Sequence, residues 1–449
     1  MKTMTIFVLA FTCADLHMDA QQKLCLSLDD MFALAETNSR EIRVSMSGHE
    51  VAEEEVLMAK SQRLPDVNLS VGGSYIGTAT MLSRGFSSGG STTVPYAIGA
   101  GTVNNGAQPT PHWGNDFVAQ VTQVVYAGGG ISAAVKLAEQ GSELAKLDID
   151  KKRQDVRFIL AGHYLEMCKL NNMIEVVKTN VGLAEQVLRD MRVRYEQGTL
   201  LKTDITRYEL QLHQLLLTET ELKDAASIVN HQLVTTLRLP ADVTICPVDM
   251  QEYGDGQELQ QWHMLAQREN VGIKQMQLLA DMETTGVKAA RASLLPSVAI
   301  VAEDRLAGPY VNDLIPVDAN INAWFVGISV KYDLGNLWRN NHGVRRARVK
   351  AMQSRQQVEL VQENIDKAVQ ADYVNVQTAM TAIDTQRKQV ELAEEHYRVT
   401  KSRYDSGLAL LTDMLDASNM KLSADMELVN AQIKLLYNFY KLKYSTSTL

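Results

Sequence analysis

The sequence is poor in proline and in aromatic residues. Its 449 residues include 9 prolines, and Phe, Trp and Tyr together make up 6% of the chain. Few prolines combined with abundant Ala, Leu, Gln, Glu and Lys favour long uninterrupted helices. No stretch approaches the roughly 18 consecutive apolar residues of a membrane-spanning helix, which excludes a bundle of such helices.

Motifs of metal, redox and enzyme chemistry are also missing. The four cysteines form no C-x-x-C pair, so neither a zinc site nor a thiol redox motif is indicated. No G-x-S-x-G or P-loop sequence occurs, and the three glycines at 128–130 favour a bend between a strand and a helix. The histidines are scattered without metal-ligand spacing. We therefore expect no enzyme activity, no metal site and no cofactor.

The net charge gives information about partners, and the N-terminus indicates export. The net charge is −9 and the pI about 5.6, so there is no electrostatic reason to expect a nucleic acid partner. Residues 1–20 are typical of an export signal, with Lys2 before an apolar run and Ala20 as the cleavage point. Cys13 leaves a lipidated N-terminus open. A disulfide between Cys25 and Cys246 is compatible with an oxidising periplasm, but the sequence does not fix it.

A short motif occurs twice and indicates an internal duplication. Each copy has the form R-Y-x-x-G followed by T-D, and the copies stand 209 residues apart, as Arg194, Tyr195, Gly198, Thr203 and Asp204, then Arg403, Tyr404, Gly407, Thr412 and Asp413. Five identities in one register are unexpected by chance, and a repeat changes the fold question. We expect repeat 1 to cover 21–245 and repeat 2 to cover 246–449.

Each half is predicted to run helix, strand, strand, helix, turn, helix. Hydrophobic spacing of three and four predicts the helices, and strict alternation predicts the strands. The expected elements are a helix at 28–60, strands at about 66–76 and 116–127, a helix at 265–292, and strands at about 297–303 and 322–333. Polar segments at 77–115 and 304–320 are expected to be loops. The hairpin turns are expected at Gly198 and Gly407.

The long helices carry coiled-coil seams on both sides of the turns. Apolar residues recur at alternating spacings of four and three, as in Val177, Val181, Ala184, Leu188 and Met191 before the first turn, Val369, Tyr373, Val376, Met380 and Ile383 before the second, and Leu422, Met426, Val429, Ile433, Leu436 and Tyr440 after it. A helix from Gly130 to the first turn would reach on the order of 100 Å. Such helices are stable in water only when packed together, which predicts two coiled-coil hairpins per chain.

The strands have the length of those that cross a bilayer at a tilt. Four strands cannot close a barrel, and open edges in lipid would leave backbone groups unpaired, so other copies must complete the sheet. Three copies give twelve strands and room for a pore. Aromatic residues near the strand ends suit a membrane interface: Trp113, Tyr126, Trp324 and Tyr332. Two alternatives remain: a half-buried sheet in a soluble α+β protein, or a periplasmic coiled-coil adaptor or scaffold without a pore.

The segment R-Y-D-S-G-L-A-L-L-T-D-M-L-D-A at 403–417, together with the duplicated plan, resembles the TolC-like outer membrane channels. The resemblance implies a mainly α fold with a small β part. It implies a homotrimer with a twelve-stranded barrel in outer-membrane lipid and a long periplasmic α-helical tunnel. It further implies a passive exit channel of a tripartite efflux pump or type I secretion system in a Gram-negative bacterium. Its partners would be a periplasmic adaptor (membrane fusion) protein and an inner-membrane transporter.

The resemblance also implies roles for single residues. Asp413 and Asp416 match an acidic pair at the periplasmic constriction, and Gly198 and Gly407 match the tip turns where the adaptor docks. A spacing of three places both carboxylates on one helix face, so a trimer would carry stacked acidic rings. The alternative is two solvated carboxylates near a helix start. Tyr404 and Asp204 match gating contacts.

One departure concerns the gate. Ala409 stands where the family member best known for gating has an arginine, and Arg207 occupies the position equivalent to Asp416 in the first repeat. We hypothesise that Arg207 or Arg194 supplies the missing cation.

Overall fold

A computed structural model describes residues 22–75, 112–248, 258–311, 316–317 and 319–449. The predicted signal at 1–20, with Cys13, and nearly all of the predicted loop at 77–115 lie outside these residues. None of the helices in the described ranges combines the length and the apolar character needed to cross a bilayer.

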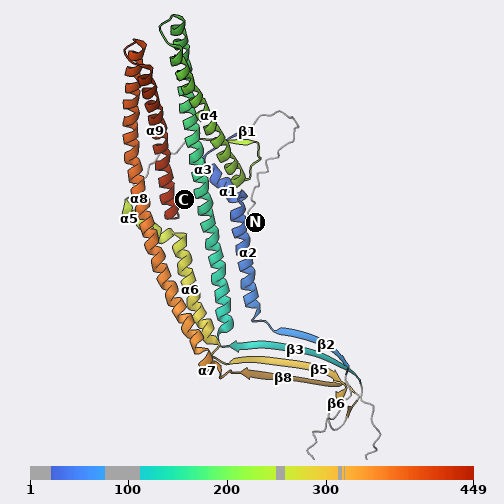
Figure 1. The fold of residues 1–449 in the computed structure, drawn as a ribbon. Coiled ribbons are helices and arrows are strands. Elements are labelled where there is room, and N and C mark those ends of the chain that lie inside the picture. The colour runs from blue at the N-terminus through green and yellow to red at the C-terminus, as the bar shows by residue number, and fades with distance from the viewer. Residues whose placement is uncertain (1–21, 76–111, 249–257, 312–315, 318) are drawn as a thin grey trace, which may run out of the picture. The chain divides into compact units, whose positions relative to one another are not determined.

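The predicted plan is present in both halves of the chain (Figure 1). The first half contains β1 (Gln22–Leu26), α1 (Leu28–Asn38), α2 (Arg40–Ser61), β2 (Asp66–Tyr75), β3 (Trp113–Ala127), α3 (Gly130–Glu196) and α4 (Lys202–Leu237). The second half contains β4 (Val243–Pro247), α5 (Leu259–Glu269), α6 (Val271–Ala292), β5 (Ser297–Gly308), β6 (Tyr310–Val311), β7 (Pro316–Val317), β8 (Ile321–Lys331), α7 (Asn336–Arg339), α8 (Asn341–Asp405) and α9 (Leu411–Ser445).

The first helix of each half is broken, which corrects the predicted single helices at 28–60 and 265–292. Ser39 separates α1 from α2, and Asn270 separates α5 from α6, both in extended backbone conformation. Asn270 accepts a hydrogen bond from the amide of Ile273 at 3.1 Å and donates one to the carbonyl of Ser445 at 2.8 Å. These bonds stabilise the start of a new helix. No proline marks either break, so spacing alone did not reveal it.

The first strand of the second half is longer than predicted, whereas the second, β8, ends two residues earlier than predicted. β5 continues to Gly308 instead of ending near 303, and the predicted loop at 304–320 contains the β6–β7 pair. Asp304 and Arg305 interrupt the apolar alternation, which ended the predicted strand early. Arg305 is held on the sheet by Asp116 of β3, with Nε–Oδ1 and Nη2–Oδ2 distances of 2.8 and 3.1 Å.

The main sheet is antiparallel, in the order β2-β3-β5-β8 (Figure 1). Cross-strand register places apolar residues opposite one another, as in Val71 with Phe117 and Ile300 with Ile328. Large apolar side chains on the edge strands are largely exposed: Val67, Leu69 and Val71 on β2, and Trp324, Val326, Ile328 and Val330 on β8. A soluble monomer rarely exposes an apolar surface of this kind to water. We therefore expect this apolar face of the sheet to be covered.

A glycine turn joins β3 to α3. Gly128 and Gly129 both have positive φ, 61° and 82°. Gly128 also lies against α6, because a Cβ at this position would stand 2.5 Å from the carbonyl oxygen of Ala292. Only glycine satisfies both the left-handed backbone and the close approach.

The two glycines should therefore differ on substitution. We expect Gly128→Ala to destabilise the fold by about 2–4 kcal/mol, because it adds a backbone clash to the left-handed strain. Gly129→Ala, which has open space around its Cβ, should cost about 1 kcal/mol. Urea denaturation of the purified variants in detergent measures both values. Equal losses would contradict the close approach.

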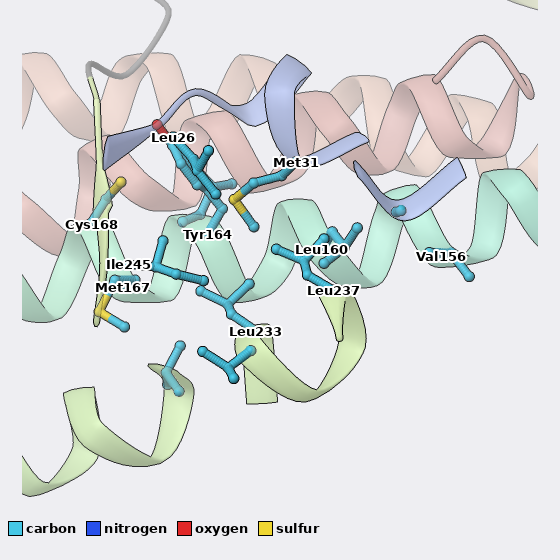
Figure 2. Packing of buried hydrophobic residues seen from close by; sticks show 14 of the residues in the cluster. Leu26, Met31, Val156, Leu160, Tyr164, Met167, Cys168, Leu233, Leu237 and Ile245 are labelled. Atoms are coloured by element: carbon cyan, nitrogen blue, oxygen red, sulfur yellow. The ribbon is translucent and has the colours of Figure 1, made fainter. Parts of the chain in front are cut away.

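The chain divides into two compact units, each drawing on both halves of the sequence. One contains the main sheet with residues 51–142 and 279–354; the other contains residues up to 50, 143–278 and 355–449. In the second unit, α1, α3, α4 and the β1–β4 pair enclose an apolar core, shown in Figure 2 with Met31, Leu160, Leu233 and Leu237. All four side chains are fully buried.

The predicted seams form the helix interfaces of this second unit. All five seam residues before the first turn are buried, and Val177 and Met191 are 0% and 1% exposed. Of the seam before the second turn, Val369, Val376 and Ile383 are buried, while Met380 is 38% exposed. After that turn, Val429, Ile433 and Leu436 are buried. The two hairpins, α3–α4 and α8–α9, are drawn in Figure 1. The buried clusters show that they pack by the heptad residues.

Candidate functional site

The duplicated motif forms the same turn at the end of each hairpin. After α3, the amide of Thr199 donates to the carbonyl of Arg194 at 3.0 Å, and the amide of Gly198 donates to that of Tyr195 at 2.9 Å. Gly198 has a φ of 76°. This is the Schellman arrangement, in which a left-handed glycine lets the chain close the last helical turn.

The second copy repeats these bonds. Leu408 donates to the carbonyl of Arg403 at 2.7 Å, Gly407 donates to that of Tyr404 at 3.0 Å, and Gly407 has a φ of 72°. The motif is therefore a helix stop signal. Its glycine supplies the backbone angle, and its first two residues supply the carbonyls.

The two turns enclose a cleft of about 740 Å³. Of the predicted site residues, the cleft brings together Arg194, Asp204, Arg207, Tyr404 and Gly407. Ala409 and Asp405 also line it, whereas Gly198, Asp413 and Asp416 are not among its lining residues. The four predicted gating residues thus line one cleft. The predicted acidic pair follows the lining residues in the sequence but does not line the cleft.

An ion pair joins the two hairpins across this cleft. Nη2 of Arg194, on α3, lies 3.1 Å from Oδ1 of Asp405, at the end of α8. The Arg194 guanidinium also lies over the Tyr404 ring, 5.8 Å from its centroid, a cation–π contact. Both charged side chains are partly exposed, at 33% and 48%, so the pair contributes modestly to stability by itself. The pair therefore links the α3–α4 hairpin directly to the α8–α9 hairpin.

Asp405 is the residue that sequence reasoning missed. It occupies a variable position of R-Y-x-x-G, where the first copy has Glu196. Both copies carry an acid there, and this was the available signal. The pattern could not show that Asp405 faces the other hairpin.

Tyr404 is buried at the centre of the site. It is 7% exposed, and its hydroxyl has no hydrogen-bond partner among the described residues. Burial raises the pKa of Tyr404, and the nearby carboxylates of Asp204 and Asp405 raise it further while Arg194 lowers it. The hydroxyl therefore stays protonated at neutral pH and can donate a hydrogen bond. Asp204 lies near enough to influence it, but no bond joins the two side chains.

The acidic pair sits on the first turns of α9. Asp413 accepts a hydrogen bond from the amide of Leu410 at 3.1 Å, which caps the helix. Asp416 makes no hydrogen bond or ion pair with any described residue, and both carboxylates lie on exposed residues. Asp413 thus caps α9, whereas Asp416 contacts no polar or charged partner among the described residues.

The two candidate cations differ in their surroundings. Arg207 is exposed and forms no ion pair within the described ranges. Arg194 reaches the other hairpin through Asp405. Of the two residues in the hypothesis, the geometry therefore favours Arg194 as the replacement for the arginine absent at Ala409.

Comparison with known proteins gives one consistent result. Residues 32–237 and 262–445 match the family described as OEP: Outer membrane efflux protein. The Outer membrane protein TolC of Escherichia coli K12 is 20% identical over 436 residues, which cover 94% of this chain and 82% of that relative. A match to the Outer membrane protein TolC of Salmonella enteritidis, at 21% identity, spans only 38% of that relative's length.

A solved structure shares the fold. The outer membrane protein VceC from Vibrio cholerae superposes with a TM-score of 0.74 at 16% identity, covering 94% of this chain and 96% of that chain. At this level of identity the likeness concerns the fold alone. The long helical hairpins and the four-stranded sheet are thus an arrangement already seen in an outer membrane protein.

Proposed function

The chain belongs to the outer membrane efflux protein family, and we propose that it serves as the exit channel of a tripartite efflux pump or a type I secretion system. It is an outer-membrane protein with a large periplasmic part. Family membership sets aside the coiled-coil scaffold without a pore. It equally sets aside the soluble α+β protein.

The channel is a homotrimer. In the sheet order β2-β3-β5-β8, the outer edges of β2 and β8 have no partner strand among the described residues. An unpaired edge in lipid costs several kcal/mol for each backbone group. Pairing β8 of one copy with β2 of the next removes both edges. Three copies then give twelve strands, with the apolar face carrying Leu69 and Trp324 toward the lipid and the face carrying Arg305 and Asp116 toward the lumen.

The tips receive the periplasmic adaptor. Three leucines at the turns are largely exposed, Leu201 at 68%, Leu408 at 72% and Leu410 at 70%. Apolar side chains in this number at the end of a hairpin suit end-to-end contact with another helical hairpin. Substrate choice and energy come from the inner-membrane transporter joined through that adaptor, because the proposed channel is passive.

The gate lies in the cleft between the turns. The Arg194–Asp405 pair holds the α3–α4 hairpin against the end of α8, and docking of the adaptor would separate them. Asp416, together with Asp413, forms the acidic rings at the mouth, where closely spaced carboxylates favour cations and repel anions.

The single observation that carries the proposal is the sheet with one exposed apolar face and two open edges. Fractionation followed by unheated gel electrophoresis tests it. The chain is expected in the outer-membrane fraction as an oligomer that dissociates on heating. A soluble monomer would overturn the proposal.

Adaptor docking has its own test. A photo-crosslinking amino acid at Leu408 is expected to capture a periplasmic hairpin protein in intact cells. The matched control is Leu392 on α8, which is 55% exposed but lies outside the turn. Equal crosslinking at both positions would contradict docking at the tips.

A further inference from the structure

Two cysteines far apart in the sequence face each other across a small parallel sheet. β1 and β4 form this sheet, and their register places Cys25 directly opposite Cys246. Both side chains are exposed, and both are free thiols in this structure. The strand pair therefore presents a matched pair of thiols on its outer face.

The strands are fixed firmly enough to hold this register. On the inner face, Leu26 and Ile245 are buried in the core shown in Figure 2. Asn230 of α4 clamps β4 by donating to the carbonyl of Val243 at 2.9 Å and accepting from the amide of Ile245 at 2.8 Å. Packing and hydrogen bonds thus keep Cys246 from sliding along its neighbour.

The separation of the two cysteines suits a covalent bond. Paired strands lie about 4.8 Å apart, and the Cα atoms of a disulfide are about 4.4–6.8 Å apart. Burial raises the pKa of the Cys246 thiol, and the Cys25 thiol lies close enough to raise that pKa further. No backbone movement along the strands is needed to bring the sulfurs together.

We propose that Cys25 and Cys246 form a disulfide in the exported protein. The reaction is thiol–disulfide exchange with a disulfide donor of the oxidising envelope. The thiolate of one cysteine attacks the donor and releases one donor thiol. The other cysteine then attacks the mixed disulfide and releases the second donor thiol, so two protein thiols are oxidised while one donor disulfide is reduced. The product ties the N-terminal strand to the start of the second half.

The remaining described cysteine does not compete. Cys168 on α3 is 7% exposed, and burial raises its pKa to about 12. A buried thiol with so little thiolate is inert to exchange. Burial, and next the Cys25 thiol, also raise the pKa of Cys246, so formation depends on an efficient donor rather than on spontaneous reaction.

Peptide mapping tests the proposal without using channel activity. Cells are treated with a thiol-alkylating reagent before lysis, and the purified chain is digested without reductant. We expect one linked peptide joining Cys25 to Cys246, lighter than the reduced pair by two hydrogen atoms, and its loss on reduction. Alkylation of both cysteines, or linkage of either one to Cys13 or to another chain, would overturn the proposal.

A register control separates geometry from mere proximity. In a Cys25→Ser background, Lys23→Cys moves the thiol two residues along the same exposed face, about 6.6 Å from its former position. This variant is expected to show less than one tenth of the linkage of the wild type. Equal linkage would show that the strand pair slides, which contradicts the register argument.

Discussion

Replacing Arg194 by alanine is expected to raise single-channel conductance several-fold in planar bilayers. Arg194 holds the two hairpins of one chain together through Asp405 and packs on Tyr404. Its removal also leaves the carboxylates of Asp204 and Asp405 in the cleft without the Arg194 cation. In the proposed trimer the loss would act three times, so a modest pair gives a large combined effect on the opening equilibrium.

The control lies two residues away. Arg192 pairs with Glu209 at 2.9 Å within the α3–α4 hairpin, so Arg192→Ala removes the same charge without releasing the other hairpin. Asp405→Asn should reproduce the effect of Arg194→Ala, and exchange of the two residues should restore low conductance. An unchanged Arg194→Ala conductance, with a rise for Arg207→Ala, would transfer the role to Arg207.

Replacing Asp416 by asparagine is expected to weaken block by a multivalent cation at least tenfold. The attraction between two unit charges about 4 Å apart is worth about 1 kcal/mol even in water. In the proposed trimer, three Asp416 carboxylates would act together on a polyvalent ion in a narrow mouth. Asp416 has no partner among the described residues, so its charge is available to the ion. Reversal potentials in a salt gradient should shift toward lower cation selectivity.

Asp413→Asn provides the comparison, because it changes capping as well as charge. It weakens the bond to the Leu410 amide, at a cost of about 1 kcal/mol for the start of α9. Hydrogen exchange at 408–414 should therefore accelerate in Asp413→Asn and stay unchanged in Asp416→Asn. Loss of block in Asp413→Asn alone would place the selective ring there.

The sequence predicted the features that arise from local rules. The R-Y-x-x-G frame placed both turns because a left-handed glycine after a helix is readable from position. The seam residue Val177 and the apolar face with Trp324 followed from periodicity. The break at Asn270 did not, since it depends on a distant partner, the Ser445 carbonyl. The break at Ser39 did not either, because no proline marks it. The end of β5 was missed because Arg305 is stabilised across the sheet by Asp116.

The candidate site was predicted only in part, because a local motif reveals its own residues but not their distant partners. Arg194, Asp204 and Tyr404 were found through the duplicated motif, and the structure brings them into one cleft. Asp405 was missed because its partner comes from the other hairpin.

The proposed trimer depends on pairing of β2 of one chain with β8 of its neighbour in the outer membrane. Cysteines at Ser70 on β2 and at Ser329 or Gly327 on β8, in a Cys25→Ser/Cys246→Ser background, test it directly by oxidative crosslinking in cells. We expect covalent dimers and a closed covalent trimer in the outer-membrane fraction for at least one of the β8 positions. Monomers alone, or crosslinked species in the soluble fraction, would contradict it.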